Sequence, residues 1–272
     1  MKKIKQIVTI FAALALAVTA GLSFAGTKTK AAGSDEFTRT AIEIAADMGY
    51  GWNLGNTMEA TNTWTSNPKV TDFETAWGQP VTTKAMIDGI KKAGFNSIRI
   101  PVSWSNMMSS DGNYTIDASY FKRVDEIISY AFANDMYVII NDHYDGGWWE
   151  HFCGNKRDCM KHYKNMWTQV AEHYKDYSEK LIFESANEEL GDSLKKSLSK
   201  IDVNISDTAL YNLVNEINQT FVDIVRQSGG NNARRYLLIA GFNTDIDKTC
   251  SSLYEMPTDT ISNHLMVSVH YY

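Results

Sequence analysis

The stretch LIFESANEEL, from Leu181 to Leu190, passes from an apolar run directly into a group of polar and acidic residues. Its first three residues are apolar, as in a buried strand. Glu184, Asn187, Glu188 and Glu189 follow. Carboxylates are almost never fully buried unless they are paired. The end of this strand is therefore either a solvated loop or a site at which a carboxylate has a chemical role.

Short apolar runs recur along the chain and alternate with amphipathic segments of helical spacing. Strands are predicted at 48–56, 96–102, 137–142, 180–187, 235–242 and 264–272, and helices at 82–95, 117–135, 159–177 and 207–230. Mostly continuous apolar runs are typical of parallel strands that are covered on both faces. Their regular alternation with helices predicts an α/β protein with a (β/α)8 TIM barrel. Because about six of eight strands are present and the last runs to the final residue, we expect an incomplete barrel, truncated at the C-terminus.

The N-terminus has the pattern of a secretory signal. Lys2, Lys3 and Lys5 precede an apolar, alanine-rich run, and Ser23-Phe24-Ala25 offers a small-x-small cleavage site. We therefore expect a signal peptide at 1–25, a polar leader at 26–35, a catalytic barrel at 36–272 and secretion to the extracellular space. The alternative is an uncleaved membrane anchor, since the run is long enough to span a bilayer. After cleavage no membrane partner is expected.

Composition excludes several classes of partner. The 272 residues carry a formal charge of -6, so there is no basic excess to bind the phosphates of nucleic acid. Cys153, Cys159 and Cys250 have no spacing typical of zinc ligands, and we predict neither a metal nor a cofactor. An oxidising compartment permits a disulfide between Cys153 and Cys159, but the odd count leaves at least one thiol unpaired.

Polar residues follow five of the six predicted strands. In a (β/α) barrel the chemistry lies at the C-terminal strand ends, so these side chains should meet at one rim. Each has a structural alternative, such as an ion-pair partner for Arg99 or a surface carboxylate for Glu188. Trp148 and Trp149 either plug the core or stack on a sugar ring. The residues at the strand ends are Asn53, Asn56, Arg99, His143, Asp145, Asn187, Glu188, His270 and Tyr272.

Five motifs in this order resemble glycoside hydrolase family 5, the cellulase-like retaining glycosidases with a (β/α)8 barrel. The opening motif resembles the endoglucanase and xyloglucanase-like branch of that family. The motifs spread over nearly all of the chain after the leader, which makes the resemblance specific. They are GWNLGNTMEA (51–60), NSIRIPVSW (96–104), INDHYDGGWW (140–149), FESANE (183–188) and SVHYY (268–272).

The resemblance implies a role for each matching residue. Glu188 matches the acid/base, and Asn187 matches the residue that hydrogen-bonds the sugar 2-hydroxyl. Arg99 matches the arginine near the nucleophile, and His143 the histidine of the central subsite. A His-x-Tyr pair at His270 and Tyr272 matches the pair whose tyrosine contacts the nucleophile. Asn53 and Trp148 complete the set of substrate-binding residues that we predict.

Three departures from the family pattern stand out. Glu189 replaces the usual proline after the Asn-Glu pair, and Tyr144 replaces a usual second histidine. Because adjacent strand residues face opposite ways, we expect Glu189 to point away from Glu188. The family's nucleophile glutamate lies on the seventh strand, and we find no residue for it in this chain. Asp142, Asp145 and Glu184 are expected on other strand ends or faces.

The sequence therefore predicts a glycoside hydrolase that cleaves β-1,4-glucan-type polysaccharide, with an endoglucanase as the full-length product and a fragment that is inactive alone. A xyloglucanase or mannanase of the same family is the alternative within this class. A carbohydrate-binding fragment without catalysis is an alternative of another class, favoured by Trp64, Trp104 and the Trp148-Trp149 pair. An unrelated barrel enzyme, such as a lyase or aldolase, would need a Schiff-base lysine or metal ligands at the strand ends.

Overall fold

The computed structural model describes residues 36–196 and 202–271, and its centre is one parallel sheet. The six strands pair in chain order, so each strand lies beside the next one in the sequence. This confirms the six predicted strands and the incomplete (β/α)8 barrel. The predicted signal peptide and leader lie outside the described residues. The strands are β1 (Gly51–Asn53), β2 (Ser97–Ile100), β3 (Tyr137–Asn141), β4 (Leu181–Glu184), β5 (Leu237–Ala240) and β6 (Leu265–Ser268).

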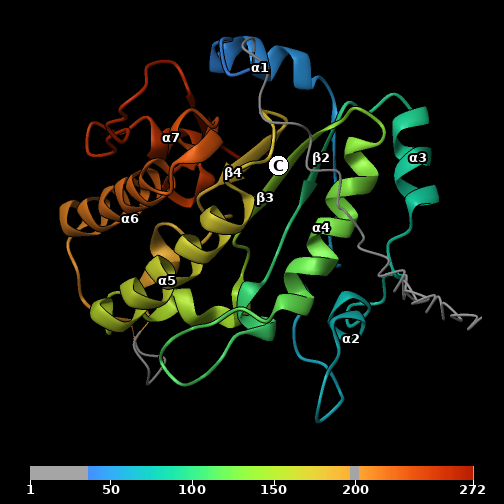
Figure 1. Cartoon of the computed structure of the whole chain (residues 1–272). Coiled ribbons are helices and arrows are strands. Elements are labelled where there is room, and N and C mark those ends of the chain that lie inside the picture. Colours follow the sequence, from blue (N-terminus) through green and yellow to red (C-terminus); the bar gives the residue numbers. More distant parts are fainter. Residues whose placement is uncertain (1–35, 197–201, 272) are drawn as a thin grey trace, which may run out of the picture.

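Helices cover the outer side of the sheet, as the alternating pattern predicts (Figure 1). The helices are α1 (Ala41–Met48), α2 (Val70–Glu74), α3 (Lys84–Lys92), α4 (Ala118–Phe132), α5 (Lys156–Tyr174), α6 (Asp207–Gln227) and α7 (Ile246–Thr249). Short 3-10 helices lie at Trp104–Met107, Asp145–His151, Asp192–Lys195, Gly230–Ala233 and Phe242–Thr244. On α4, Val124, Ile127, Ile128 and Ala131 are fully buried, as expected for the inward face of an amphipathic helix.

The register of the strands brings polar residues to one level of the barrel interior. Asn53 pairs with Arg99 across β1 and β2, and Asn141 pairs with Glu184 across β3 and β4. Alternate residues of a strand share a face. Ser268, at the carboxyl end of β6, completes this level, and its hydroxyl reaches Glu184. The sheet therefore carries a polar layer at the carboxyl ends of its strands.

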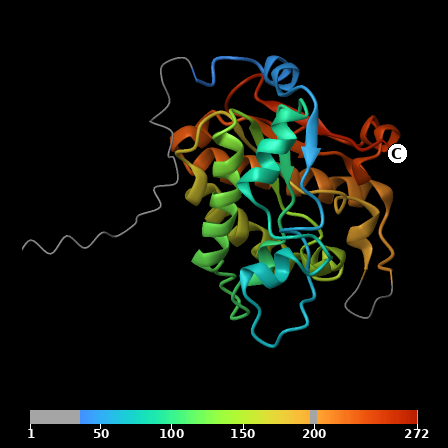
Figure 2. The same cartoon turned by 90° about the vertical axis from the view of Figure 1, so that its right-hand side faces the viewer.

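Helix α1, which the sequence analysis did not predict, lies across the opposite end of the barrel. In Figure 2, strand β1 starts beside α1 and points away from it. The side chain of Thr40 accepts from the backbone of Glu43 and the side chain of Glu43 accepts from Thr40, so a capping box starts this helix. Ile44 is fully buried against residues at the amino ends of the strands, including Tyr137 and Tyr236.

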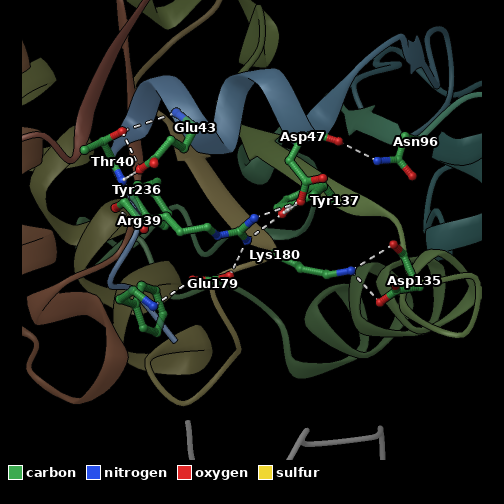
Figure 3. Close-up of polar contacts among 11 residues, drawn as sticks. Arg39, Thr40, Glu43, Asp47, Asn96, Asp135, Tyr137, Glu179, Lys180 and Tyr236 are labelled. Carbon is green, nitrogen blue, oxygen red and sulfur yellow. Dashed lines mark hydrogen bonds and ion pairs between the residues drawn. The ribbon is translucent and has the colours of Figure 1, made fainter. Parts of the chain in front are cut away.

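Polar contacts fasten α1 and the residues before it to several strands (Figure 3). Arg39 bonds Glu179, which precedes β4, and its guanidinium lies 2.8 Å from the Tyr137 hydroxyl at the start of β3. The Tyr236 hydroxyl donates to the Arg39 carbonyl at 2.6 Å, and the Ala41 N–H donates to the Asn263 carbonyl at 2.7 Å. This end of the barrel is therefore closed by structural contacts, which leaves the carboxyl ends for a site.

Candidate active site

Arg99 on β2 connects three strands at the carboxyl end of the barrel. Its guanidinium donates to Glu184 Oε2 at 2.6 Å, to Asn53 Oδ1 at 2.9 Å and to Asn187 Oδ1 at 2.9 Å. The rigid fork of an arginine fixes the geometry of each acceptor that it reaches. Arg99 therefore holds two other predicted substrate-binding residues, Asn53 and Asn187, in place.

Glu184 is a central residue of this site that the sequence analysis did not assign to it. Its side chain is almost fully buried and also accepts hydrogen bonds from Asn141 Nδ2 and Ser268 Oγ, each at 3.0 Å. A buried carboxylate needs a charge partner and further hydrogen bonds, and Arg99 supplies the charge. The expectation that Glu184 faces elsewhere is wrong, because its position in the register directs it into the barrel beside Asn141.

Glu188 stands at the rim of the barrel and contacts the end of β6. Glu188 Oε1 lies 2.7 Å from His270 Nδ1. The Glu188 side chain is 44% exposed and that of His270 is 23% exposed, so the carboxylate is open to a ligand while the imidazole is partly covered. This contact joins the β4 end to the β6 end across 82 residues of sequence.

A cavity of about 580 Å³ opens between these residues. Six of the eight predicted site residues line it, which places residues from five strand ends around one space. The predicted Tyr272 lies outside the described residues, whereas its neighbour Tyr271 lines the cavity. The lining is Asn53, Arg99, His143, Glu184, Asn187, Glu188, Leu238, Ser268, His270 and Tyr271.

His143 follows β3 and lines the cavity. Burial and, to a smaller extent, the positive charge of Arg99 lower the pKa of His143 to about 3, while Glu188 opposes the shift. The ring is therefore neutral at physiological pH. His143 Nδ1 is buried and accepts or donates no hydrogen bond among the residues that the structure describes. A neutral imidazole carries one N–H donor and one acceptor nitrogen, so the ring edge that lines the cavity can bind a hydroxyl group.

A strained corner after β5 holds the backbone of His270. Asn243 and Thr244 have φ angles of 53° and 50°, and a β-branched residue in this region is a true outlier. The Thr244 carbonyl accepts from the His270 N–H at 2.7 Å, and the Asn243 N–H donates to the Leu190 carbonyl at 2.6 Å. A Cβ atom at Gly191 would lie 1.9 Å from Asn243 Oδ1, so only glycine fits beside this corner. The corner thus fixes the loops that carry Glu188 and His270.

Trp148 does not line the described cavity, and the sugar-stacking role remains a prediction. Its ring stacks on Trp149 at 4.5 Å and on His162 at 4.3 Å between centroids, and its Nε1 donates to Asp145 Oδ2 at 2.6 Å. These contacts pack the loop after β3 against the protein interior. Burial raises the pKa of Asp142, at the end of β3, and of Asp145, in this loop.

Glu189 is also buried, and the strand alternation from which its direction was predicted does not hold at this position. Strand β4 ends at Glu184, so Glu188 and Glu189 lie in the following loop and alternation does not apply to them. The Glu189 carboxylate accepts from the Tyr144 N–H at 2.6 Å and from the Asn187 N–H at 2.9 Å. Burial raises the pKa of Glu189 to about 7 although these bonds lower it.

Other predictions concern thiols, metals and membranes. Cys153, Cys159 and Cys250 are all free thiols, so the possible bridge between Cys153 and Cys159 is absent. Across residues 36–196 and 202–271, no three His, Cys, Asp or Glu side chains cluster as a metal site would require. Nor does any helix in those ranges have the length and apolarity needed to cross a bilayer.

Comparison with known proteins identifies the family. The model for cellulases of glycosyl hydrolase family 5 matches residues 58–272. The chain belongs to glycosyl hydrolase family 5. A curated family 5 relative, Endoglucanase A of Paenibacillus barcinonensis, is 41% identical over 276 aligned residues, which cover 96% of this chain and 65% of the relative. A xyloglucan-specific endo-beta-1,4-glucanase of Bacteroides ovatus is 34% identical and covers 86% of this chain and 45% of its own length.

Solved family 5 structures share the fold. A broad specificity endoglucanase from Ruminococcus champanellensis with bound cellotriose has a TM-score of 0.77 and 37% identity, covering 88% of this chain and 68% of that one. A lichenase from Caldicellulosiruptor sp. F32 in complex with cellotetraose has a TM-score of 0.77 and 38% identity, covering 89% and 66%. The chain spans about two thirds of the length of these family 5 structures, and about half to two thirds of the two curated relatives.

Proposed function

We propose that this family 5 chain carries the acid/base part of an endoglucanase site for β-1,4-glucan polysaccharide. One observation carries the proposal: the Glu188 carboxylate stands at the rim of the polar cavity, in contact with His270 and next to Asn187. A carboxylate that is both reachable and hydrogen-bonded to an ionisable partner can give and take a proton. The relatives named above are glucanases, which supports a β-glucan as the substrate.

The proposed reaction is the retaining two-carboxylate route. Glu188 in its acid form donates a proton to the glycosidic oxygen while a second carboxylate attacks the anomeric carbon. Glu188 then takes a proton from the water that hydrolyses the glycosyl intermediate. Arg99, Asn187, His143, His270 and Asn53 would bind the sugar around the cleaved bond. Tyr272, outside the described residues, keeps its proposed role beside the nucleophile.

We propose that the nucleophile is not among the described residues. A retaining site needs its two carboxyl groups about 5–5.5 Å apart, with the nucleophile free to form a bond. Glu184 is the second carboxylate in the described lining of the cavity, but both of its oxygens accept hydrogen bonds, from Arg99, Asn141 and Ser268. Its contacts suit a residue that holds Arg99 in place.

Substrate choice and location follow as proposals. The alternative within this family is a xyloglucanase or mannanase, and a xyloglucan-specific relative supports the first of these. Polysaccharides of this size are degraded outside the cell, which agrees with the signal pattern at 1–25. The commitment of Glu184 to Arg99 favours a second candidate function, a carbohydrate-binding chain without catalysis.

The test is turnover by the purified chain on carboxymethylcellulose, lichenan, xyloglucan and mannan, beside calorimetry with cellotetraose. Turnover that is lost in Glu188→Gln supports the acid/base role and places a second carboxylate within the chain. The matched control is Glu216→Gln, which removes a carboxylate on α6 that pairs with Lys156. Binding without turnover supports the second candidate. Turnover that survives in Glu188→Gln would remove Glu188 from the mechanism.

A further inference from the structure

Two departures from the family pattern contact each other. Tyr144 stands where a second histidine is usual and Glu189 stands where a proline is usual. The Tyr144 N–H donates to Glu189 Oε1 at 2.6 Å, and the Asn187 N–H donates to Glu189 Oε2 at 2.9 Å. One carboxylate therefore bridges the backbone of the loop after β3 and the backbone of the loop after β4. A proline at 189 would supply neither acceptor.

Both bridged backbones carry residues of the candidate site. Asn187 directly precedes Glu188, and its side-chain oxygen accepts from Arg99. Tyr144 directly follows His143, whose N–H donates to the Val102 carbonyl at 3.0 Å. The Glu189 carboxylate thus lies between the two segments that flank Glu188 and His143, and its side chain is buried there.

The loop on the other side of the bridge is under backbone strain. Tyr144 and Asp145 have φ angles of 56° and 49°, which is unusual for a bulky residue such as tyrosine. Such residues persist when surrounding contacts hold them, and they concentrate at functional sites. The bond from the Tyr144 N–H to Glu189 and the bonds of Asp145 to Ser105 are contacts of this kind.

We propose that Glu189 is a positioning residue, whose carboxylate clamps the Tyr144 backbone to the Asn187 backbone and thereby holds Glu188 against His270. The proposal rests on the acid/base role of Glu188 for its meaning in catalysis. The clamp itself is a property of the free protein. Glu189 touches neither the open part of the cavity near Arg99 nor His270, so it acts through the two backbones that it joins.

The charges around Glu189 set the pH at which the clamp ionises. Acidic neighbours come from three segments: Glu184 on β4, Asp142 at the end of β3 and Asp145 in the following loop. Glu188 directly precedes Glu189 in the chain, and His143, which precedes Tyr144, is neutral. The cation Arg99 is bonded to Glu184 and not to Glu189. Burial, with repulsion from Glu184, keeps the proton on Glu189 up to about pH 7. The two N–H bonds therefore strengthen as the pH rises through this range.

The first part of the test is nuclear magnetic resonance of the 272-residue chain between pH 5 and pH 9. An amide proton bonded to a carboxylate shifts when that carboxylate gains a proton. We expect the amides of Tyr144 and Asn187 to titrate together with one midpoint near 7. Both titrations should vanish in Glu189→Gln, since the glutamine amide does not ionise and its Nε2 would face an N–H donor.

The second part asks whether the clamp positions Glu188. Glu188→Gln removes the charged partner of His270 and gives the ring shifts of His270 without that contact. We expect Glu189→Gln to move the His270 ring shifts toward those of Glu188→Gln at pH 8. The matched control is Glu150→Gln, a carboxylate beside the same loop that pairs with Lys196. It should leave the His270 shifts at the wild-type values. His173, paired with Asp125 on the outer surface, reports any global change.

Two results would overturn the proposal. Amide shifts of Tyr144 and Asn187 that are the same in the wild type and in Glu189→Gln at every pH would show that the clamp is absent. Amide titrations that vanish while His270 keeps its wild-type shifts would show that the clamp does not hold Glu188. Neither readout depends on sugar turnover, so a failure here is distinct from a failure of the proposed glucanase function.

Discussion

The side chains of the candidate site form one network through Arg99. Its guanidinium holds Glu184, Asn53 and Asn187, and Glu184 in turn binds side chains from β3 and β6. A network of this kind is stable while every member is satisfied and fails when one is removed. Single substitutions here should therefore have large effects on folding as well as on ligand binding.

Arg99→Met should be strongly destabilising. It leaves the Glu184 carboxylate buried without its cation, and breaking a buried pair in this way costs about 3–5 kcal/mol. Adding Glu184→Gln to Arg99→Met removes the unpaired charge and should recover part of the loss. Urea unfolding of the two variants and the wild type measures both effects. Surface substitutions usually change the unfolding free energy by less than about 0.5 kcal/mol. A change this small in Arg99→Met would contradict the network.

Glu189 should make the protein less stable as the pH rises. Its pKa in the folded state is about 7 against an ordinary value of 4.5, so the folded state binds the proton more tightly than the unfolded chain. Stability is therefore lost between pH 4.5 and 7, by about 3 kcal/mol at one pKa unit per 1.36 kcal/mol.

The variant Glu189→Gln isolates this effect. Its unfolding free energy should fall less than that of the wild type between pH 4.5 and pH 8, because the glutamine does not ionise and no longer repels the Asp142 carboxylate. Urea unfolding at the two pH values gives the comparison. Equal losses in the two proteins would show that Glu189 titrates normally.

Sequence reasoning found six residues of the cavity and missed Glu184, the last residue of β4. Asn53, Arg99, His143, Asn187, Glu188 and His270 line one cavity. Glu184 was misplaced because its role depends on side-chain partners from β2, β3 and β6, which only the three-dimensional structure brings together. The signal available in the sequence was Arg99, an arginine inside an apolar strand with no acidic residue close to it in the chain. Such an arginine needs an acidic partner from another strand. The stacking of Trp148 on Trp149 and His162 depends on the path of the loop, which a sequence does not show.

Among the elements, α1 shows how a short helix closes the barrel end away from the site. Ile44 is fully buried in a cluster with Phe37, Tyr137 and Tyr236, while Ile42 on the same helix is 82% exposed. The amphipathic helix thus gains its stability from one face. Its signal in the sequence was the pair Thr40 and Glu43, three residues apart, which is the pattern of a capping box.

The two isoleucines of α1 provide a matched pair of variants. Ile44→Ala should lower the unfolding free energy by about 2–5 kcal/mol, since it opens a cavity at the end of the barrel. Ile42→Ala should change it by less than about 0.5 kcal/mol, as surface substitutions usually do. Thermal or urea unfolding measures both. Similar losses in the two variants would show that α1 is not docked by this face.

For the whole molecule, the main feature is a sheet whose first and last strands are not paired with each other in the described part of the chain. Apolar side chains are exposed at both ends: Trp52 on β1 is 45% exposed, and Val267 and Val269 at β6 are 40% and 42% exposed. Unpaired strands with apolar side chains favour association between copies. The barrel pattern was readable in the sequence because each strand pairs with its neighbour in the chain.

The isolated chain should therefore associate as its concentration rises. Val267→Lys places a charge on the open β6 edge and should lower the fraction of associated protein in sedimentation velocity experiments. Leu253→Lys, an exposed position in the loop before β6, serves as the control and should leave association unchanged. A wild-type chain that stays monomeric at all concentrations would contradict this expectation.

The bond between Ala41 and Asn263 has a consequence for biosynthesis. These residues are 222 positions apart, and the helix that starts at Ala41 packs on strands that a ribosome makes much later. At about 5–20 residues per second, residue 263 follows residue 41 by about 10–45 s. During that interval the apolar face of the nascent helix gains its partners one after another, Tyr137 first and Tyr236 later, and lacks its bond to Asn263 until the end. A chaperone that binds such faces would have its opportunity then, and would be displaced when the last described strand arrives.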